Sequence, residues 1–267
     1  AIKAIEAYSY VVPLYDWTSN TVYTTYNDNI VGQPSQSYYV RTDDNNVYVC
    51  IRQGKSAAGA TQVSQNKPIH TGTTLPIEAD GYIWKFLYTI TTANANSFLT
   101  SNFMPVKLLD SALPTDPEFS QYSVQNSAII GQILGYRVIN GGSGYSSPTL
   151  QVIGDGTGAS AYPIVSSGVI TAVEIGDSSG ALNPGAFLGT NYNKANVKIV
   201  GSGSGASIVP IFGPKTGLGA DPRQDLRSTA IMFNIKPEGT VSGKWPVDND
   251  YRQVGLLKNI TDSAGVK

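Results

Sequence analysis

The sequence predicts a mainly β fold, in which an antiparallel, β-sandwich-like domain with few short helices is interrupted by a two-copy, glycine-rich β module. The 267 residues include 28 glycines and 16 tyrosines, and 14% of them are charged, which is below the usual quarter and suits a β structure with many turns. The first half contains a ring-bearing alternating segment, and the second half contains a repeated glycine-rich segment. We expect the sandwich-like domain at 1–120 and 226–267, and the inserted module at 121–225.

The central predicted element is a strand at residues 82–90, which follows the turn dipeptide Asp80-Gly81. Side chains alternate across a strand, so one face is expected to carry four large rings: Tyr82, Trp84, Phe86 and Tyr88. Each ring buries about 150–250 Å² when it is covered. We therefore predict a core strand whose ring-bearing face packs against the rest of the β-rich chain.

Two strands are expected before the central one. Residues 38–41 and 46–52 are joined by turn-forming residues at 42–45, which predicts a hairpin. Cys50 lies in the second of these strands and is expected to be an inert buried thiol, because a single cysteine cannot form an internal disulfide or a cysteine-rich zinc site. The polar segment 54–75 is long enough for a functional or locally mobile loop.

After the central strand, Thr91 or Thr92 is expected to cap a short helix. The apolar run at 104–109 leads into a connector broken by Pro114 and Pro117, and this connector places a domain boundary near residue 120. The last expected elements are a strand at 229–235, a turn at Trp245-Pro246 and a polar loop running into an apolar segment at 248–259.

The second half contains an internal repeat. Residues 152–165 and 199–212 match in their glycines, alanine, serine and proline at an offset of about 47 positions, which is a spacing typical of structural repeats. Between the two copies, residues 167–175 alternate as a strand. We expect a glycine-turned β module from roughly residue 130 to residue 215.

The glycine-rich stretches are predicted to be tight β-turns and not phosphate-binding loops. A phosphate-binding loop needs a Lys-Ser/Thr pair, and a dinucleotide fingerprint needs a following helix, whereas Pro163 and Pro210 follow here. Asp155 and Asp177 could be considered as calcium ligands. The calcium-binding repeat must recur many times, however, and Ser202 replaces Asp155 in the second copy. We therefore expect no calcium.

The sequence predicts no enzyme, and we assign no catalytic, cofactor-binding or metal-binding residues and no cofactor. His70 is the only histidine, and we expect it to be a solvated loop residue. A serine triad would need this imidazole together with a nucleophile elbow that the sequence lacks, and zinc needs three or four ligands. Any two of the 19 acids can meet in space as a glycosidase pair. None of them lies in an aromatic-rich strand, where we would expect a sugar cleft.

Charge and hydropathy limit the partners. The net charge is -1 without a long basic run, which predicts no nucleic-acid partner. No apolar run approaches the roughly 20 residues that span a bilayer, which predicts no membrane partner. Because Ala1 opens the chain in a strand-like segment, we expect an N-terminal piece of the full protein to be absent.

Three patches of the sequence carry a family likeness: Pro13-Leu14-Tyr15-Asp16-Trp17 with the hairpin strands at 38–41 and 47–50; residues 79–90 with Met104-Pro105-Val106; and residues 249–259. In these patches the chain resembles the small baseplate wedge proteins of T-even-type contractile-tailed bacteriophages. The order of the patches matches that of the family. The glycine-rich module does not match and is interpreted as an insertion, and the family's N-terminal portion is missing.

This resemblance implies a mostly β protein that forms a homodimer and joins other wedge subunits in the tail baseplate of the virion, after assembly in the host cytoplasm. It implies a protein without an active site, which holds the baseplate in one arrangement and allows a switch when the tail contracts. An alternative function is a receptor- or glycan-binding tail module that contacts host-surface glycans through exposed rings: Tyr136, Tyr145 and Tyr192. An enzyme that degrades surface polysaccharide is the least favoured alternative.

Overall fold

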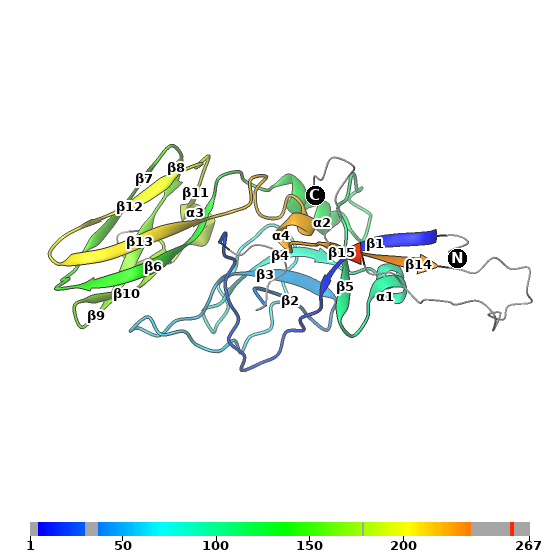
Figure 1. The fold of residues 1–267 in the computed structure, drawn as a ribbon, viewed down its shortest axis with the longest axis horizontal. Coiled ribbons are helices and arrows are strands. Elements are labelled where there is room, and N and C mark those ends of the chain that lie inside the picture. Colours follow the sequence, from blue (N-terminus) through cyan, green and yellow to red (C-terminus); the bar gives the residue numbers. More distant parts are fainter. Residues whose placement is uncertain (1–4, 30–36, 178, 236–256, 259–267) are drawn as a thin grey trace, which may run out of the picture.

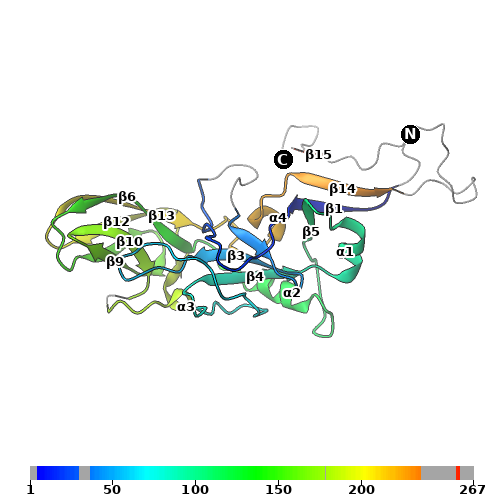
Figure 2. The same cartoon turned by 90° about the horizontal axis from the view of Figure 1, so that it is seen from below.

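The computed structural model describes residues 5–29, 37–177, 179–235 and 257–258. It confirms the predicted mainly β fold class, because the described residues form fifteen strands and four short helices. Every pairing between the named strands is antiparallel. Figures 1 and 2 show an elongated molecule with two parts. We call residues 133–212 the module and the other described residues the body. The described helices are all short: α1 Thr92–Phe98, α2 Phe119–Asn126, α3 Pro184–Phe187 and α4 Pro222–Asp225.

The body contains a three-stranded sheet in the order β2 (Tyr39–Arg41), β3 (Asn46–Arg52) and β4 (Ile83–Thr89). β2 and β3 form the predicted hairpin, with Asn45 at a φ of 60° in the turn. Both faces of this sheet are covered, so six successive residues of β3 are buried. Cys50 is one of them, as predicted.

The arrangement of rings on β4 differs from the prediction. Tyr82, Trp84 and Phe86 do share one core cluster, but Tyr88 packs in the other cluster, on the face of Leu87. The register slips by one residue between the pairs of Phe86 and Tyr88 with β3. Such a β-bulge inserts one extra residue and moves the residues beyond it to the opposite face.

A second sheet of the body has the order β15 (Leu257–Lys258), β14 (Ala230–Ile235), β1 (Ile5–Pro13) and β5 (Phe103–Val106). Val12, Met104 and Val106 of this sheet share one core with Val49 and Leu87 of the three-stranded sheet, which gives the expected sandwich-like packing. The predicted strand at 229–235 and the predicted helix are confirmed, and the Thr91 hydroxyl caps α1. The expected turn at Trp245-Pro246, and residues 248–256 and 259 of the expected loop, lie outside the described residues.

The module consists of eight strands: β6 Ile133–Ser143, β7 Thr149–Gly154, β8 Thr157–Ala159, β9 Ala161–Ser166, β10 Val169–Ile175, β11 Leu188–Thr190, β12 Ala195–Val200 and β13 Ser204–Phe212. Three antiparallel pairs, β6/β13, β7/β12 and β9/β10, are hydrogen-bonded. β6 also packs beside β10, β9 beside β7 and β12 beside β13, so the six strands close into a ring. The ring encloses a core to which all six strands contribute: Val138, Leu150, Ala161, Val165, Ile170, Val173, Val197, Ile199, Ala206 and Ile208.

The sequence repeat is also a repeat in the structure. Leu188 pairs with Ala159 and Thr190 with Thr157. Residues 47 positions away make the equivalent contacts, because Gly141 pairs with Ala206 and Ser143 with Ser204. β7 of the first copy pairs with β12 of the second, so the two copies together build the ring.

Candidate functional site

The prediction of a solvated His70 is wrong. The His70 side chain is 14% exposed, and its ring packs edge-on against the ring of Tyr48. Nε2 lies 3.0 Å from the Trp84 carbonyl oxygen, and Nδ1 lies 3.7 Å from Glu78 Oε1. Burial lowers the pKa of the imidazole. His70 therefore anchors its loop to β4. The sequence missed this role because the contacts with Tyr48, Glu78 and Trp84 form only when the loop folds back onto the sheet.

The three tyrosines of the glycan-binding alternative are not exposed. Tyr145 is 7% and Tyr192 is 6% exposed, and half-buried Tyr136 belongs to the module core. The ring of Tyr145 lies under the turns at Gly142 and Gly203, where an added Cβ would approach it to 2.8 Å and 2.6 Å. Tyr192 lies in the same way under Gly189 and Gly156, at the equivalent positions of the repeat. These rings support the turns from below and present no face to a sugar.

The two candidate calcium ligands each organise a turn. Asp155 accepts hydrogen bonds from the backbone N–H groups of Asn193 and Lys194, and these bonds lower its pKa. Asp177 accepts from Ser179 and Ala181, which lowers its pKa in the same way. Within the described ranges, no three His, Cys, Asp or Glu residues are grouped as metal ligands.

The most distinctive polar site lies where the module meets the body. Arg52, at the end of β3, donates from Nε to Glu174 Oε2 of β10 at 2.5 Å, across 122 positions of the sequence. One of its terminal nitrogens also donates to the Gly81 carbonyl oxygen. Glu174 is only 3% exposed, and its Oε1 has no hydrogen-bond partner within the described structure. A buried carboxylate needs such a cation because desolvation strongly disfavours an unpaired charge.

Further contacts fasten the module to the body beside this pair. On β6, Arg137 donates to Asn27 Oδ1 at 2.7 Å and to Asp28 Oδ1 at 3.1 Å. The other oxygen of Asp28 accepts from the N–H of Phe212 in β13. In the long loop after β3, the Ala58 carbonyl oxygen accepts from the Thr171 hydroxyl. The loop predicted at 54–75 thus braces the module.

A cavity of about 180 Å³ lies within this junction. Its lining includes the charged residues Arg52, Lys55, Arg137 and Glu174. It also includes aliphatic residues: Ile51, Ile83, Leu134, Val173, Ile175, Leu182 and Ile211. Several of these aliphatic residues belong to the shared core of body and module. Sequence patterns could not predict this cavity, because its lining comes from seven separate segments of the chain.

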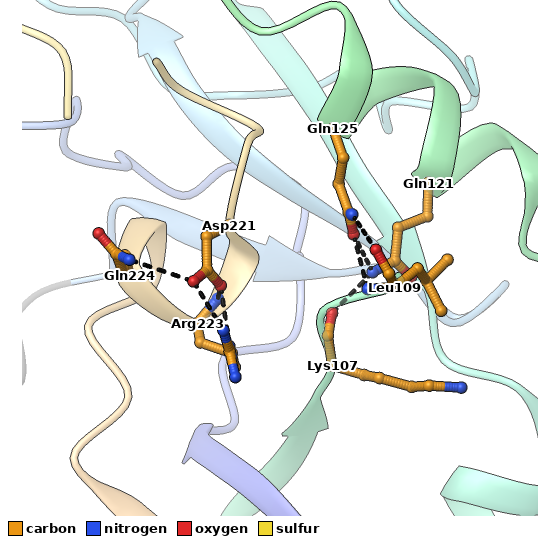
Figure 3. Close-up of polar contacts among 7 residues, drawn as sticks. All are labelled: Lys107, Leu109, Gln121, Gln125, Asp221, Arg223 and Gln224. Carbon is orange, nitrogen blue, oxygen red and sulfur yellow. Dashed lines mark hydrogen bonds and ion pairs between the residues drawn. The ribbon is translucent and has the colours of Figure 1, made fainter. Parts of the chain in front are cut away.

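The chain is also anchored on both sides of the module (Figure 3). Before it, Gln121 and Gln125 of α2 hold the backbone of Lys107 and Leu109, with Gln125 both donating to Leu109 O and accepting from Leu109 N. After it, the Asp221 carboxylate caps α4 through the Arg223 N–H and pairs with the Arg223 guanidinium at 3.0 Å.

The last residue of α4, Asp225, is a buried acid. The Asp225 side chain is fully buried, and burial raises its pKa to about 8. Its Oδ2 accepts from the Gly219 N–H at 2.8 Å, whereas Oδ1 has no partner in the described part of the chain. Burial lowers the pKa of Lys85, and Asp225 partly opposes this shift. Neither Asp225 nor Lys85 belongs to the cavity lining, and we assign both a structural role.

Comparison with known proteins adds no relative: no family model, no curated protein and no solved structure matches the chain. None of the described helices is long and apolar enough to cross a membrane.

Proposed function

We propose that the chain is a structural component of the baseplate wedge of a contractile phage tail, located in the virion. In this role it contributes to baseplate assembly and to the conformational switch during infection, as a homodimer with other wedge subunits as partners. The proposal rests on the ordered resemblance of the three sequence patches to the wedge family.

The positions of the patches agree with this proposal. Residues of the first patch bind the hairpin, since the Trp17 N–H donates to Arg41 O and the Arg41 N–H donates to Tyr15 O. β4, which carries the second patch, pairs with the same hairpin. The two patches therefore form one continuous piece of the body, whereas the module that lacks the resemblance forms a ring of its own.

The fastened junction also supports a mechanical role. An ion pair, a set of hydrogen bonds and a shared aliphatic core link the module to the body. Such links let a module act as a rigid extension that transmits force to its support. The alternative glycan-binding function loses its three ring positions, because Tyr145 and Tyr136 lie in the module core and Tyr192 is buried under glycine turns.

The test is co-expression with the other wedge proteins of a contractile-tailed phage. We expect a stable heteromeric complex on a sizing column, and a dimer mass for the isolated chain by light scattering. A chain that stays separate from the wedge proteins, or that is missing from purified virions by mass spectrometry, would contradict the proposal. Glycan-array binding by a chain that does not join the wedge would instead favour a receptor-binding function.

A further inference from the structure

We propose that the junction cavity binds a small organic carboxylate, which bridges the body and the module. This inference is independent of the proposed baseplate function, because it depends on the cavity alone. The sequence patterns predict no ligand-binding role for any residue that lines the cavity.

The charges around the cavity favour an anion. Arg52, Lys55 and Arg137 line it, against the single carboxylate of Glu174. Asp28 lies beside Arg137 and compensates a second cation. Three cations therefore face two carboxylates, which leaves one positive charge to be balanced. Half-buried Lys55 makes no ion pair with any described residue, so among the charged lining residues it is the cation without a counter-ion in the described structure.

Donor groups of the arginines also remain free. Arg52 uses Nε for Glu174 and one terminal nitrogen for Gly81, and Arg137 uses one terminal nitrogen for Asn27 and Asp28. The second terminal nitrogen of each guanidinium has no partner within the described residues. Guanidinium and ammonium groups bind carboxylates through charge-assisted hydrogen bonds, which are stronger than neutral ones.

The volume and the aliphatic wall narrow the class of ligand further. A volume of about 180 Å³ equals roughly six waters at about 30 Å³ each, and is below the range of about 300–1,000 Å³ that is typical of drug-sized sites. Ile83, Leu134 and Ile211 also line the cavity, and beside them an apolar carbon skeleton gains more from burial than a hydrated inorganic ion does. A compact carboxylate with an apolar portion matches both the charged and the aliphatic part of the lining.

The experiment is calorimetric titration of the whole chain with benzoate and succinate as carboxylate probes, glucose as a neutral probe and tetramethylammonium as a cationic one. We expect saturable binding of at least one carboxylate and none of glucose or tetramethylammonium. Lys55→Gln should weaken the carboxylate affinity about tenfold, the effect of losing roughly 1.4 kcal/mol of binding free energy. Lys198→Gln, at an exposed lysine on β12, is the matched control and should leave the affinity unchanged.

A second variant protects the test from folding effects. Arg137→Gln also removes the contact with Asp28, so its melting temperature is measured beside its affinity, whereas Lys55→Gln breaks no ion pair of the described structure. No saturable binding of either carboxylate at millimolar concentration would overturn the proposal. Equal affinities of the wild-type chain and Lys55→Gln, or binding of glucose in place of the carboxylates, would overturn it as well.

Discussion

Two buried carboxylates differ in how their charge is satisfied. Glu174 faces the guanidinium of Arg52 at 2.5 Å, whereas Asp225 has a backbone N–H on one oxygen and no partner for the other in the described structure. Burial disfavours the ionised form of a carboxyl group that lacks a close cation. Asp225 is therefore the residue at which we expect the clearest dependence of stability on pH.

We predict that Asp225→Asn stabilises the protein at alkaline pH. The folded pKa of about 8 lies above the ordinary value of 3.8, so the folded state binds more protons between these values, and the wild-type protein loses stability as pH rises from about 4 to about 8. Asparagine can still accept from the Gly219 N–H and has no charge to bury. Urea unfolding at several pH values should show that the free energy of unfolding of the variant, relative to that of the wild type, increases as the pH rises to about 8.

The control for this experiment is Asp110→Asn, at an exposed aspartate, which should leave the pH profile unchanged. A profile of Asp225→Asn that runs parallel to that of the wild type would show that Asp225 ionises freely in the folded protein.

Trp84 provides a prediction about the core. Its side chain is fully buried, stacks on Tyr82 with centroids 5.8 Å apart and meets the Tyr23 ring edge-on at 5.3 Å. Trp84→Ala should lower the free energy of unfolding by about 3–5 kcal/mol. Trp84→Phe keeps a ring and removes an indole N–H that has no partner among the described residues, so we expect a smaller loss. Unfolding followed by far-UV circular dichroism measures both, and an unchanged Trp84→Ala midpoint would place the ring outside the core.

Single residues show where sequence reasoning reaches its limit. The alternation of side chains along the predicted strands, together with their apolar composition, correctly predicted that Cys50 and Trp84 are buried. The environments of His70, Tyr145 and Tyr192 did not follow from such patterns, because each is set by residues from elsewhere in the chain. Tyr145 and Tyr192 occupy equivalent positions in the glycine repeat. This equivalence indicates a shared structural role, a ring packed under a turn, whereas the glycan-binding alternative treats both rings as exposed.

At the scale of elements, the module depends on glycine turns that pack directly on tyrosine rings. Gly203 has a φ of +95°, and a Cβ there would lie 2.6 Å from the Tyr145 ring. Gly205, two residues further on, has a φ of +81°, but its Cβ would meet nothing closer than 3.8 Å. An alanine at position 205 would therefore introduce backbone strain alone, whereas an alanine at position 203 would introduce backbone strain and steric overlap with the Tyr145 ring.

We predict that Gly203→Ala destabilises the module more than Gly205→Ala does. Both variants place a side chain at positive φ, which costs about 1–2 kcal/mol. Gly203→Ala also forces a methyl group into the Tyr145 ring, and overpacking of this kind costs about 1–3 kcal/mol more. Thermal unfolding of the two variants measures the difference. Equal melting temperatures would mean that the Tyr145 ring moves away without cost.

Local elements were the part of the fold that the sequence predicted best. The hairpin of β2 and β3, the helix capped by Thr91 and the strand β14 follow from turn residues, caps and alternation, which are properties of neighbouring residues. The bulge in β4 does not, because it is a feature of the pairing with β3 and not of neighbouring residues in the chain.

At the scale of the whole molecule, the junction between module and body is the feature that sequence patterns could not predict. Arg52 and Glu174 are 122 positions apart, and Arg137 and Asn27 are 110 apart. No periodicity connects such residues. The same holds for the cavity, whose lining is assembled only when both parts are folded.

We predict that Glu174→Gln uncouples the two parts. Removal of one partner from a fully buried pair costs about 3–5 kcal/mol, and we expect less here because the Arg52 side chain is 15% exposed. The module contains no tryptophan, so fluorescence follows the rest of the chain, whereas far-UV circular dichroism follows both parts. The two midpoints should coincide in the wild type and separate in the variant.

Asp16→Asn is the matched control for this pair. It removes the partner of Arg41, but Asp16 is 51% exposed, and exposed pairs contribute at most about 1 kcal/mol. Its two midpoints should stay together. Coincident midpoints in Glu174→Gln would show that the aliphatic core alone couples the module to the body.

The ends of the module have a consequence of their own. Ile133 and Phe212 are partners on adjacent strands, and the Cα atoms of such partners lie about 4.5–5.5 Å apart. A domain whose two ends lie this close together matches the short distance between the two ends of a surface turn, so its insertion there does not require the flanking strands to move apart. The ring therefore meets the distance requirement for an inserted domain, but exchanging it for another domain would also require a new partner for the aliphatic core that it shares with the body.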